Sequence, residues 1–265
     1  MLSIDTSLLS AIAELFGALV TLVLLLGCLT EHQNTEQTDK PFIALLCSQI
    51  ALLLLDASSW VLLSIPQMRH SPLVTSFSLL VAILTVIMTV LYNGFLTGYI
   101  SDRRRISLWF HHAVLAVFAA MLIVWIVFLA NGLYVRYDAA GMEHEGSIFF
   151  LTRLVNYLLI AANMVYIFCY HSVLGWKETA VLMSYGILPL LASGLNPYWP
   201  TTPQLLAATL SLLLLYVIIH IHRTRRAAQQ EVQLMQQKLQ LAQQELELTD
   251  SRTKIMLSAA AAFPL

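Results

Sequence analysis

Charged residues are scarce in this chain, and their scarcity excludes an ordinary soluble protein. Lysine, arginine, aspartate and glutamate together make up 11% of the 265 residues, whereas hydrophobic residues make up 58%. A soluble domain carries roughly a quarter charged residues. The mean hydropathy of +0.75 indicates a membrane protein instead. The formal net charge of −1 indicates no particular partner, and no nucleic-acid partner is expected.

Cysteines and metal-binding motifs are also rare. The three cysteines, Cys28, Cys47 and Cys169, lie inside long apolar segments, so the sequence offers no extracellular disulfide. The sequence contains no zinc motif of the H-E-x-x-H kind. We therefore expect neither a metal site nor a cofactor.

Long apolar segments are what the chain has in abundance. A transmembrane helix needs about 20 mostly apolar residues. The sequence has seven such segments, which cover residues 8–29, 41–63, 73–100, 108–130, 148–170, 179–195 and 204–222. The first lacks the basic start and the cleavage site of a signal peptide, and we find no internal repeat. We predict an all-α integral membrane protein built as a seven-transmembrane-helix bundle.

The basic residues predict the orientation of this bundle. With the N-terminus outside, the outer segments contain only Arg69 and Arg136 as basic residues. The cytoplasmic segments contain Lys40, Arg103, Arg104, Arg105, Lys177, Arg223, Arg225 and Arg226. Cytoplasmic loops of membrane proteins carry such an excess of lysine and arginine. We therefore predict an outer N-terminus and a cytoplasmic C-terminus.

Ionisable residues inside membrane helices are costly and mark candidate functional sites. Glu14, Asp56 and Arg153 fall at similar depth in three different predicted helices. Trp60 follows Asp56 by about one turn, and Asn156 shares a helix face with Arg153. We predict that these five residues line an outward-facing polar pocket. Its ligand is expected to be a small molecule or a short or lipidic peptide, because the outer loops are too short to form a binding domain.

The role of Arg153 stays open at this point. Its guanidinium can bind a ligand carboxylate or phosphate through paired hydrogen bonds. Alternatively, Arg153 and one of the two acids form a ligand-independent bridge that fixes helix packing. In a third interpretation, Glu14 and Arg153 only extend to the membrane interface.

Two further features lie in the third and sixth apolar segments. Tyr92 and Asn93 lie in the inner half of the third segment, and we expect them to bond across helices. Pro189 predicts a kink in the sixth segment. Such a kink can be a hinge or a static bend.

A heptad pattern follows the last apolar segment. Val232, Leu239 and Leu246 occupy its a positions, and the seam is weak because alanine and threonine fill several other core positions. The whole seam comprises Ala228, Val232, Met235, Leu239, Ala242, Leu246, Thr249, Thr253 and Met256. A second stripe repeats every seven residues and comprises Leu234, Leu241, Leu248 and Ile255. We predict a cytoplasmic coiled coil over residues 223–258 that forms a parallel homodimer.

The chain contains no proline or glycine from Gln204 to Ser258. We therefore expect one helix to pass a signal from the membrane bundle into the coiled coil. The residues predicted to relay this signal are Pro189, His220, Arg223, Val232, Leu239 and Leu246.

The segment 248–258, LTDSRTKIMLS, resembles the segment just before the phosphorylation box of LytS-type bacterial sensor histidine kinases. In that family the next residues typically read Q-I-Q-P-H-F, with the histidine as phosphoacceptor. Here residues 259–265 read AAAAFPL and look like a truncation scar or an appended tail. Because the acceptor histidine and the ATP-binding domain are missing, we expect no enzymatic activity from this chain.

The resemblance implies a multi-pass protein of the bacterial inner (plasma) membrane. Residues 1–222 would be the transmembrane sensor domain of a two-component system, a receptor whose coiled coil controls a dimeric kinase. A small seven-helix carrier or exporter with an oligomerising tail is the alternative, although carriers of this kind are commonly built from internal repeats. A retinal photoreceptor is excluded, because the seventh apolar segment has no lysine for a Schiff base.

Overall fold

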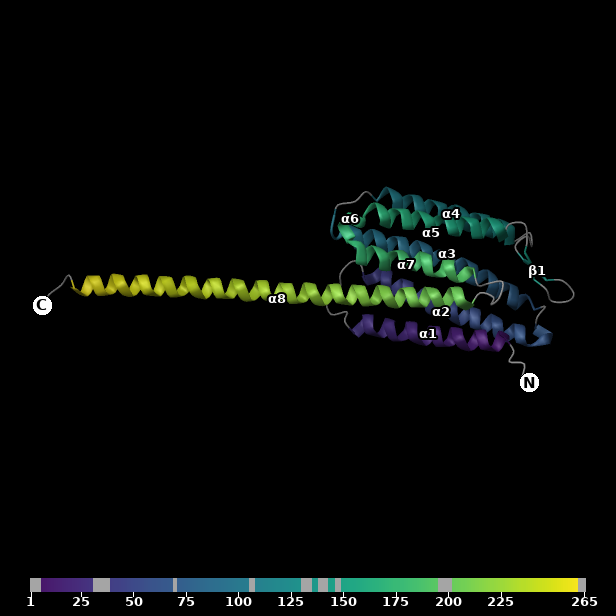
Figure 1. The fold of residues 1–265 in the computed structure, drawn as a ribbon, viewed down its shortest axis with the longest axis horizontal. Helices are drawn as coiled ribbons and strands as arrows, with labels where there is room; N and C mark the ends of the chain where they lie inside the picture. Colours follow the sequence, from purple (N-terminus) through teal and green to yellow (C-terminus); the bar gives the residue numbers. More distant parts are fainter. Residues whose placement is uncertain are drawn as a thin grey trace. The chain divides into compact units, whose positions relative to one another are not determined.

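Helices dominate the computed structural model, which describes residues 6–30, 39–68, 71–104, 108–129, 135–137, 143–145, 149–194 and 202–261. Figure 1 shows their arrangement. In chain order the elements are α1 (Thr6–Thr30), α2 (Asp39–Ser64), the 3-10 helix η1 (Pro66–Met68), α3 (Pro72–Ser101), α4 (Trp109–Leu129), β1 (Val135–Tyr137), β2 (Glu143–Glu145), α5 (Phe149–Cys169), α6 (His171–Leu174), α7 (Trp176–Ser193) and α8 (Thr202–Ala261).

Each apolar segment predicted from the sequence contains a helix: α1 to α5, α7 and the first part of α8. Four stretches among the described residues are long and apolar enough to cross a membrane, namely Leu8–Thr30, Lys40–Ser64, Ser76–Ser101 and Pro203–His222. Two shorter apolar helical stretches are Trp109–Val124 and Leu154–Cys169. The chain is therefore an all-α protein with helices suited to a membrane. The count of seven crossings and the orientation stay predictions.

Two local elements were not predicted. The antiparallel strands β1 and β2 lie between the predicted segments 108–130 and 148–170, with Arg136 opposite His144. The short helix α6 separates α5 from α7 and ends at Gly175, whose φ of +79° lies in the left-handed region. Glycine adopts this conformation without the steric penalty of a Cβ atom, so the chain turns there and α7 begins at Trp176 rather than at the predicted residue 179.

The chain divides into two compact units, Met1–Tyr216 and Val217–Leu265. In the first unit α2 packs against α1 and α3, α3 also packs against α4 and α5, and α5 packs against α7. In Figure 1, α3 lies between α2 on one side and α4 and α5 on the other. The largest fully buried side chains are Phe42, Phe95, Leu45, Leu46, Leu52, Leu53, Leu96, Ile100, Ile167, Leu182, Leu212 and Leu215.

Polar contacts join the first part of α8 to its neighbours. The fully buried Gln49 of α2 donates from Nε2 to the Leu205 carbonyl at 3.2 Å and to the Thr209 hydroxyl at 3.0 Å. The fully buried Ser211 hydroxyl has two carbonyl acceptors in reach, Ser184 of α7 at 3.0 Å and Ala207 of its own helix at 2.9 Å. Polar side chains between apolar helices contribute to helix association in a membrane. These contacts tie residues 202–216 of α8 to both α2 and α7.

Candidate functional site

The structure brings together three of the five residues predicted for the outer pocket, Glu14, Asp56 and Trp60. Glu14 of α1 is fully buried. The Asp56 carboxyl of α2 lies beside the Glu14 carboxyl and the Trp60 side chain. Asp56 Oδ2 and Trp60 Nε1 are buried without a hydrogen-bond partner among the described residues. All three residues lie in stretches that are apolar enough to cross a membrane. We call them the carboxyl–indole cluster.

The chemistry of the carboxyl–indole cluster is that of an acceptor site. Two ionised carboxylates only accept hydrogen bonds, so a bond between Glu14 and Asp56 requires a proton on one of them. A second negative charge in apolar surroundings would be costly. Residues 6–30, 72–101 and 202–216, which form α1, α3 and the first part of α8, contain no lysine or arginine. The cluster therefore suits a cation or a hydrogen-bond donor better than an anion.

The other two residues of the predicted pocket lie on α5. Asn156 is mostly buried, and its Oδ1 accepts a hydrogen bond from the Thr89 hydroxyl of α3 at 2.9 Å. Arg153 lies in the first turns of α5, and its side chain is outside the described part of the structure. Equal depth in the membrane predicted one pocket, but the described contact of Asn156 is with α3.

A buried polar network connects α3, α4 and α5. The fully buried Asn93 donates from Nδ2 to Asn163 Oδ1 at 2.7 Å. His111 Nδ1 lies 2.8 Å from Asn93 Oδ1, and since this oxygen only accepts, the imidazole nitrogen carries the hydrogen. The neighbouring Tyr92 hydroxyl donates to the Leu182 carbonyl of α7. The expectation that Tyr92 and Asn93 bond across helices is confirmed, although the sequence did not predict their partners.

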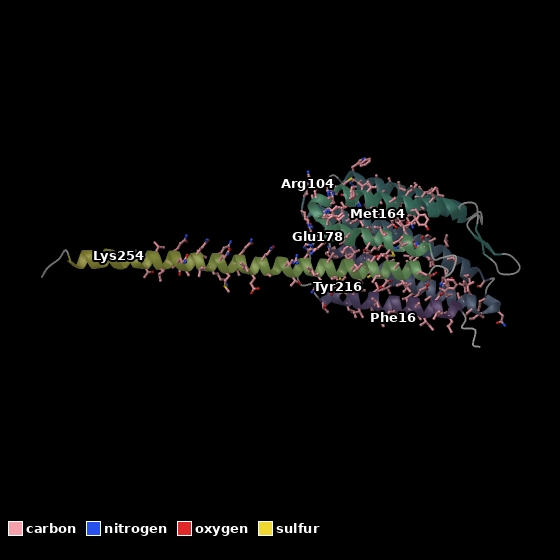
Figure 2. All side chains as sticks on the ribbon, viewed as in Figure 1. Phe16, Arg104, Met164, Glu178, Tyr216 and Lys254 are labelled. Atoms are coloured by element: carbon pink, nitrogen blue, oxygen red, sulfur yellow. The ribbon has the colours of Figure 1, made fainter. Side chains whose placement is uncertain are left out.

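An ion pair lies where α3 ends and α7 begins. Arg103 pairs through Nη1 with Glu178 Oε2 and donates from Nη2 to the Tyr99 hydroxyl at 2.9 Å. The Tyr99 hydroxyl in turn donates to Glu178 Oε2 at 3.1 Å, and the guanidinium lies 4.7 Å from the centre of the Tyr99 ring. Figure 2 shows Glu178 and Arg104 at the same end of the bundle. The sequence indicated basic residues at this end but not their acidic partner.

Glu178→Gln is expected to lower the free energy of unfolding by about 2 kcal/mol, between the values for exposed and buried pairs. The two side chains are only 16% and 13% exposed, so the uncompensated Arg103 charge would be poorly solvated. Denaturant titration of the protein in detergent, followed by circular dichroism, measures the change. The exposed neighbour Lys177, changed to glutamine, is the control and should have little effect. Equal effects of the two substitutions would contradict a structural role for the ion pair.

The predicted relay residues fall in both units. Pro189 is buried inside α7. His220 is exposed, and the side chain of Arg223 is outside the described part. In the second unit the predicted core side chains Val232, Leu239 and Leu246 are 57%, 62% and 74% exposed. The second stripe is exposed as well at Leu234, Leu241 and Leu248. The helix thus presents two apolar stripes that its own unit leaves uncovered.

Comparison with known proteins finds no relative of this chain. No protein-family model, no curated protein and no solved structure matches it. A functional assignment therefore depends on the residues and on their geometry. Among the described residues, no group of three or more histidine, cysteine, aspartate or glutamate side chains is placed to hold a metal ion.

Proposed function

We propose that this chain is the transmembrane sensor module of a LytS-type two-component histidine kinase in the bacterial inner membrane. The observation that carries the proposal is helix α8, which spans Thr202–Ala261 and begins among the apolar helices. Its second part exposes leucines at heptad spacing, which is typical of a coiled coil. A receptor needs such an output helix, whereas a simple pore does not. The chain itself has no catalytic role in this proposal.

The input site of the proposed sensor is the carboxyl–indole cluster. Its carboxyl groups and the Trp60 ring offer acceptors and an aromatic face, which together suit a small or lipidic ligand with a cationic or hydrogen-bond-donating group. Such a ligand would take the place of a proton that neutralises one of the two carboxyl groups. A ligand shifts a conformational equilibrium only by its different affinities for the two states. Here the two states would differ in the distance between the Glu14 and Asp56 carboxyl groups, and the ligand would bind more tightly at one of these distances.

The path from the input site to the output helix runs through α2 in this proposal. Gln49 lies seven residues, or about two turns, before Asp56 and therefore on the same face of α2. Gln49 also hydrogen-bonds to α8, at the Leu205 carbonyl and the Thr209 hydroxyl. A displacement of α2 at Asp56 would reach the first part of α8 through this contact. Homodimeric coiled coils would then receive the change as a rotation or a small axial shift.

A small carrier or exporter with an oligomerising tail remains the second candidate. Amide and hydroxyl side chains between α3 and α5 favour it, because polar groups inside membrane bundles also mark transport pathways. A sensor and a carrier differ in one measurable respect. Ligand binding changes the coiled coil in a sensor, whereas a carrier has no need for such coupling.

Leu239→Cys is expected to form a disulfide between two copies of the chain, because a positions face each other in a parallel coiled coil. The measurement is oxidative cross-linking of the purified protein in detergent, after Cys28, Cys47 and Cys169 have been changed to serine. Gln237→Cys, two residues away on the opposite helix face, is the matched control and should cross-link at least about tenfold more slowly. Equal rates at the two positions would exclude the predicted dimer seam.

The same assay tests coupling to the input site. Amines, short peptides, lipids and small anions are first screened for a rise in melting temperature that Asp56→Asn or Arg153→Ala abolishes. A compound that requires Asp56 should also change the cross-linking rate at Leu239→Cys. Binding without any change in cross-linking would favour the carrier. A compound that requires Arg153 rather than Asp56 would move the input site to α5.

A further inference from the structure

Helix α3 carries a polar side chain on every fourth residue over its second half. The series is Thr85, Thr89, Asn93, Thr97 and Ser101. Side chains four residues apart form one of the ridges with which helices pack against each other. We call this series the polar ridge. Its regular spacing means that a helix packed against it meets a similar group after each turn.

Helix α5 hydrogen-bonds to the polar ridge at two levels. Thr89 donates to Asn156 Oδ1 at 2.9 Å, and Asn93 donates to Asn163 Oδ1 at 2.7 Å. The Tyr166 hydroxyl of α5, further along the helix, is buried without a hydrogen-bond partner among the described residues. The partners follow each other in the same order along both helices, so α3 and α5 run parallel. Among the described residues, Ser101 and Thr85 form no hydrogen bond to α5, and they extend the ridge beyond both ends of the contact.

The hydroxyl groups of the polar ridge do not depend on α5. Thr85 donates to the Val81 carbonyl at 2.8 Å, Thr97 to the Asn93 carbonyl at 2.8 Å, and Ser101 to the Gly98 carbonyl at 2.8 Å. Thr89 has two acceptors in reach, Asn156 Oδ1 and the Thr85 carbonyl at 3.1 Å, but only one hydroxyl hydrogen. A threonine that loses its α5 partner therefore keeps a hydrogen bond within its own helix.

We propose that α3 and α5 have two hydrogen-bonded registers, one helical turn apart. In the second register α5 lies one turn further toward the C-terminal end of α3. Asn156 then faces Asn93, Asn163 faces Thr97, and Tyr166 faces Ser101. A slide in this direction pairs Asn93 with another amide, Asn156. A slide in the opposite direction would instead place the Tyr166 hydroxyl beside Asn93. One-turn slides of packed helices are a known form of conformational switching.

The second register leaves the other contacts of the ridge in place. Asn93 can keep His111 as a partner, because it accepts from His111 at Oδ1 and donates to α5 from Nδ2. Asn163 Nδ2, which is buried without a partner among the described residues, gains the Thr97 hydroxyl oxygen as an acceptor. Thr89 returns its hydrogen to the Thr85 carbonyl. The device belongs to the bundle itself and is independent of the proposed sensor function.

The experiment measures the distance between spin labels at Leu80→Cys on α3 and Val165→Cys on α5. Both side chains are exposed, at 41% and 63%, and neither belongs to the ridge or its partners. The measurement uses the whole chain in lipid nanodiscs with the native cysteines changed to serine. Two populations are expected, and the second should be longer by up to about 5 Å, one helical pitch.

Thr89→Val tests whether the hydrogen bond between Thr89 and Asn156 sets the ratio of the two distance populations. It removes a bond that only the observed register uses, so the longer population should rise about threefold, as expected for one interhelical bond in a membrane. Thr85→Val is the matched control, one turn away, and should leave the ratio unchanged. Thr89→Ser keeps the hydroxyl and should behave like the unmodified protein. A single population that Thr89→Val does not alter, or a second population at shorter distance, would overturn the proposal.

Discussion

Asn93→Ala is expected to lower the free energy of unfolding by about 3 kcal/mol, because an unpaired buried polar group costs about 1–3 kcal/mol. Asn93 is fully buried and bonds to two neighbours, so its loss leaves both Asn163 Oδ1 and His111 Nδ1 without their described partner. Interhelical hydrogen bonds in membranes are on average weaker than this. The large effect expected here comes from the two groups left unpaired. Denaturant titration in detergent measures it.

Two other asparagines on α5 provide graded controls for Asn93→Ala. Asn163→Ala leaves only the Asn93 amide without its partner and should cost about 1 kcal/mol. Asn156→Ala should cost least, since the Thr89 hydroxyl can return to the Thr85 carbonyl. The expected order of destabilisation is therefore Asn93, Asn163, Asn156. If Asn156→Ala were as damaging as Asn93→Ala, the hydrogen-bond network would not be the source of the effect.

Gly186→Leu is expected to destabilise the bundle by about 3 kcal/mol through overpacking. A Cβ atom at Gly186 of α7 would lie 3.0 Å from Ile160 Cγ2 and 3.2 Å from Met164 Sδ, both on α5. Figure 2 shows Met164 within the bundle. A leucine side chain has no room there unless α5 and α7 separate. Thermal unfolding in detergent, followed by circular dichroism, should show a lower melting temperature.

A pair of alanine substitutions separates crowding from helix propensity. Alanine is favoured over glycine in helices by about 1 kcal/mol. At Gly94 a Cβ atom would come no closer than 3.6 Å to His111 Cε1, which is ordinary contact, so Gly94→Ala should be neutral or stabilising. At Gly186 the crowding opposes the gain in propensity, so Gly186→Ala should be the less stable of the two. The reverse order would mean that α5 and α7 adjust without cost.

The helices could be predicted from the sequence because long apolar runs separated by polar segments leave few alternatives. The bounds of α2 and α3 agree with the predicted segments within two residues. The turn at Gly175 and the pair β1 and β2 were missed, because neither carries a strong hydrophobic period. Seven membrane crossings cannot be read from helix bounds alone, and α7 is not among the stretches whose length and hydropathy suffice.

The candidate site was predictable only where an ionisable residue interrupts an apolar helix. Glu14 and Asp56 stood out as acids in apolar helices, and the structure places them together. Asn156 was assigned to the same pocket because depth is readable from sequence, whereas the direction in which a helix face points is not. Gln49 is a neutral amide and gave no comparable signal. The four-residue spacing from Thr85 to Ser101 was visible in the sequence, but its partner helix was not.

The exposed leucines of α8 make the stability of its second part depend on how many copies of the chain are close enough to pack together. Leu239 and Leu246 are 62% and 74% exposed in a single chain, so they lose contact with water only when another surface covers them. An isolated helix gains most of its stability from such packing. Confinement to a membrane raises the local concentration of these helices, as a linker does between two binding modules. If the second part of α8 pairs as proposed, the number of molecules per membrane area would set what fraction of the chains is paired.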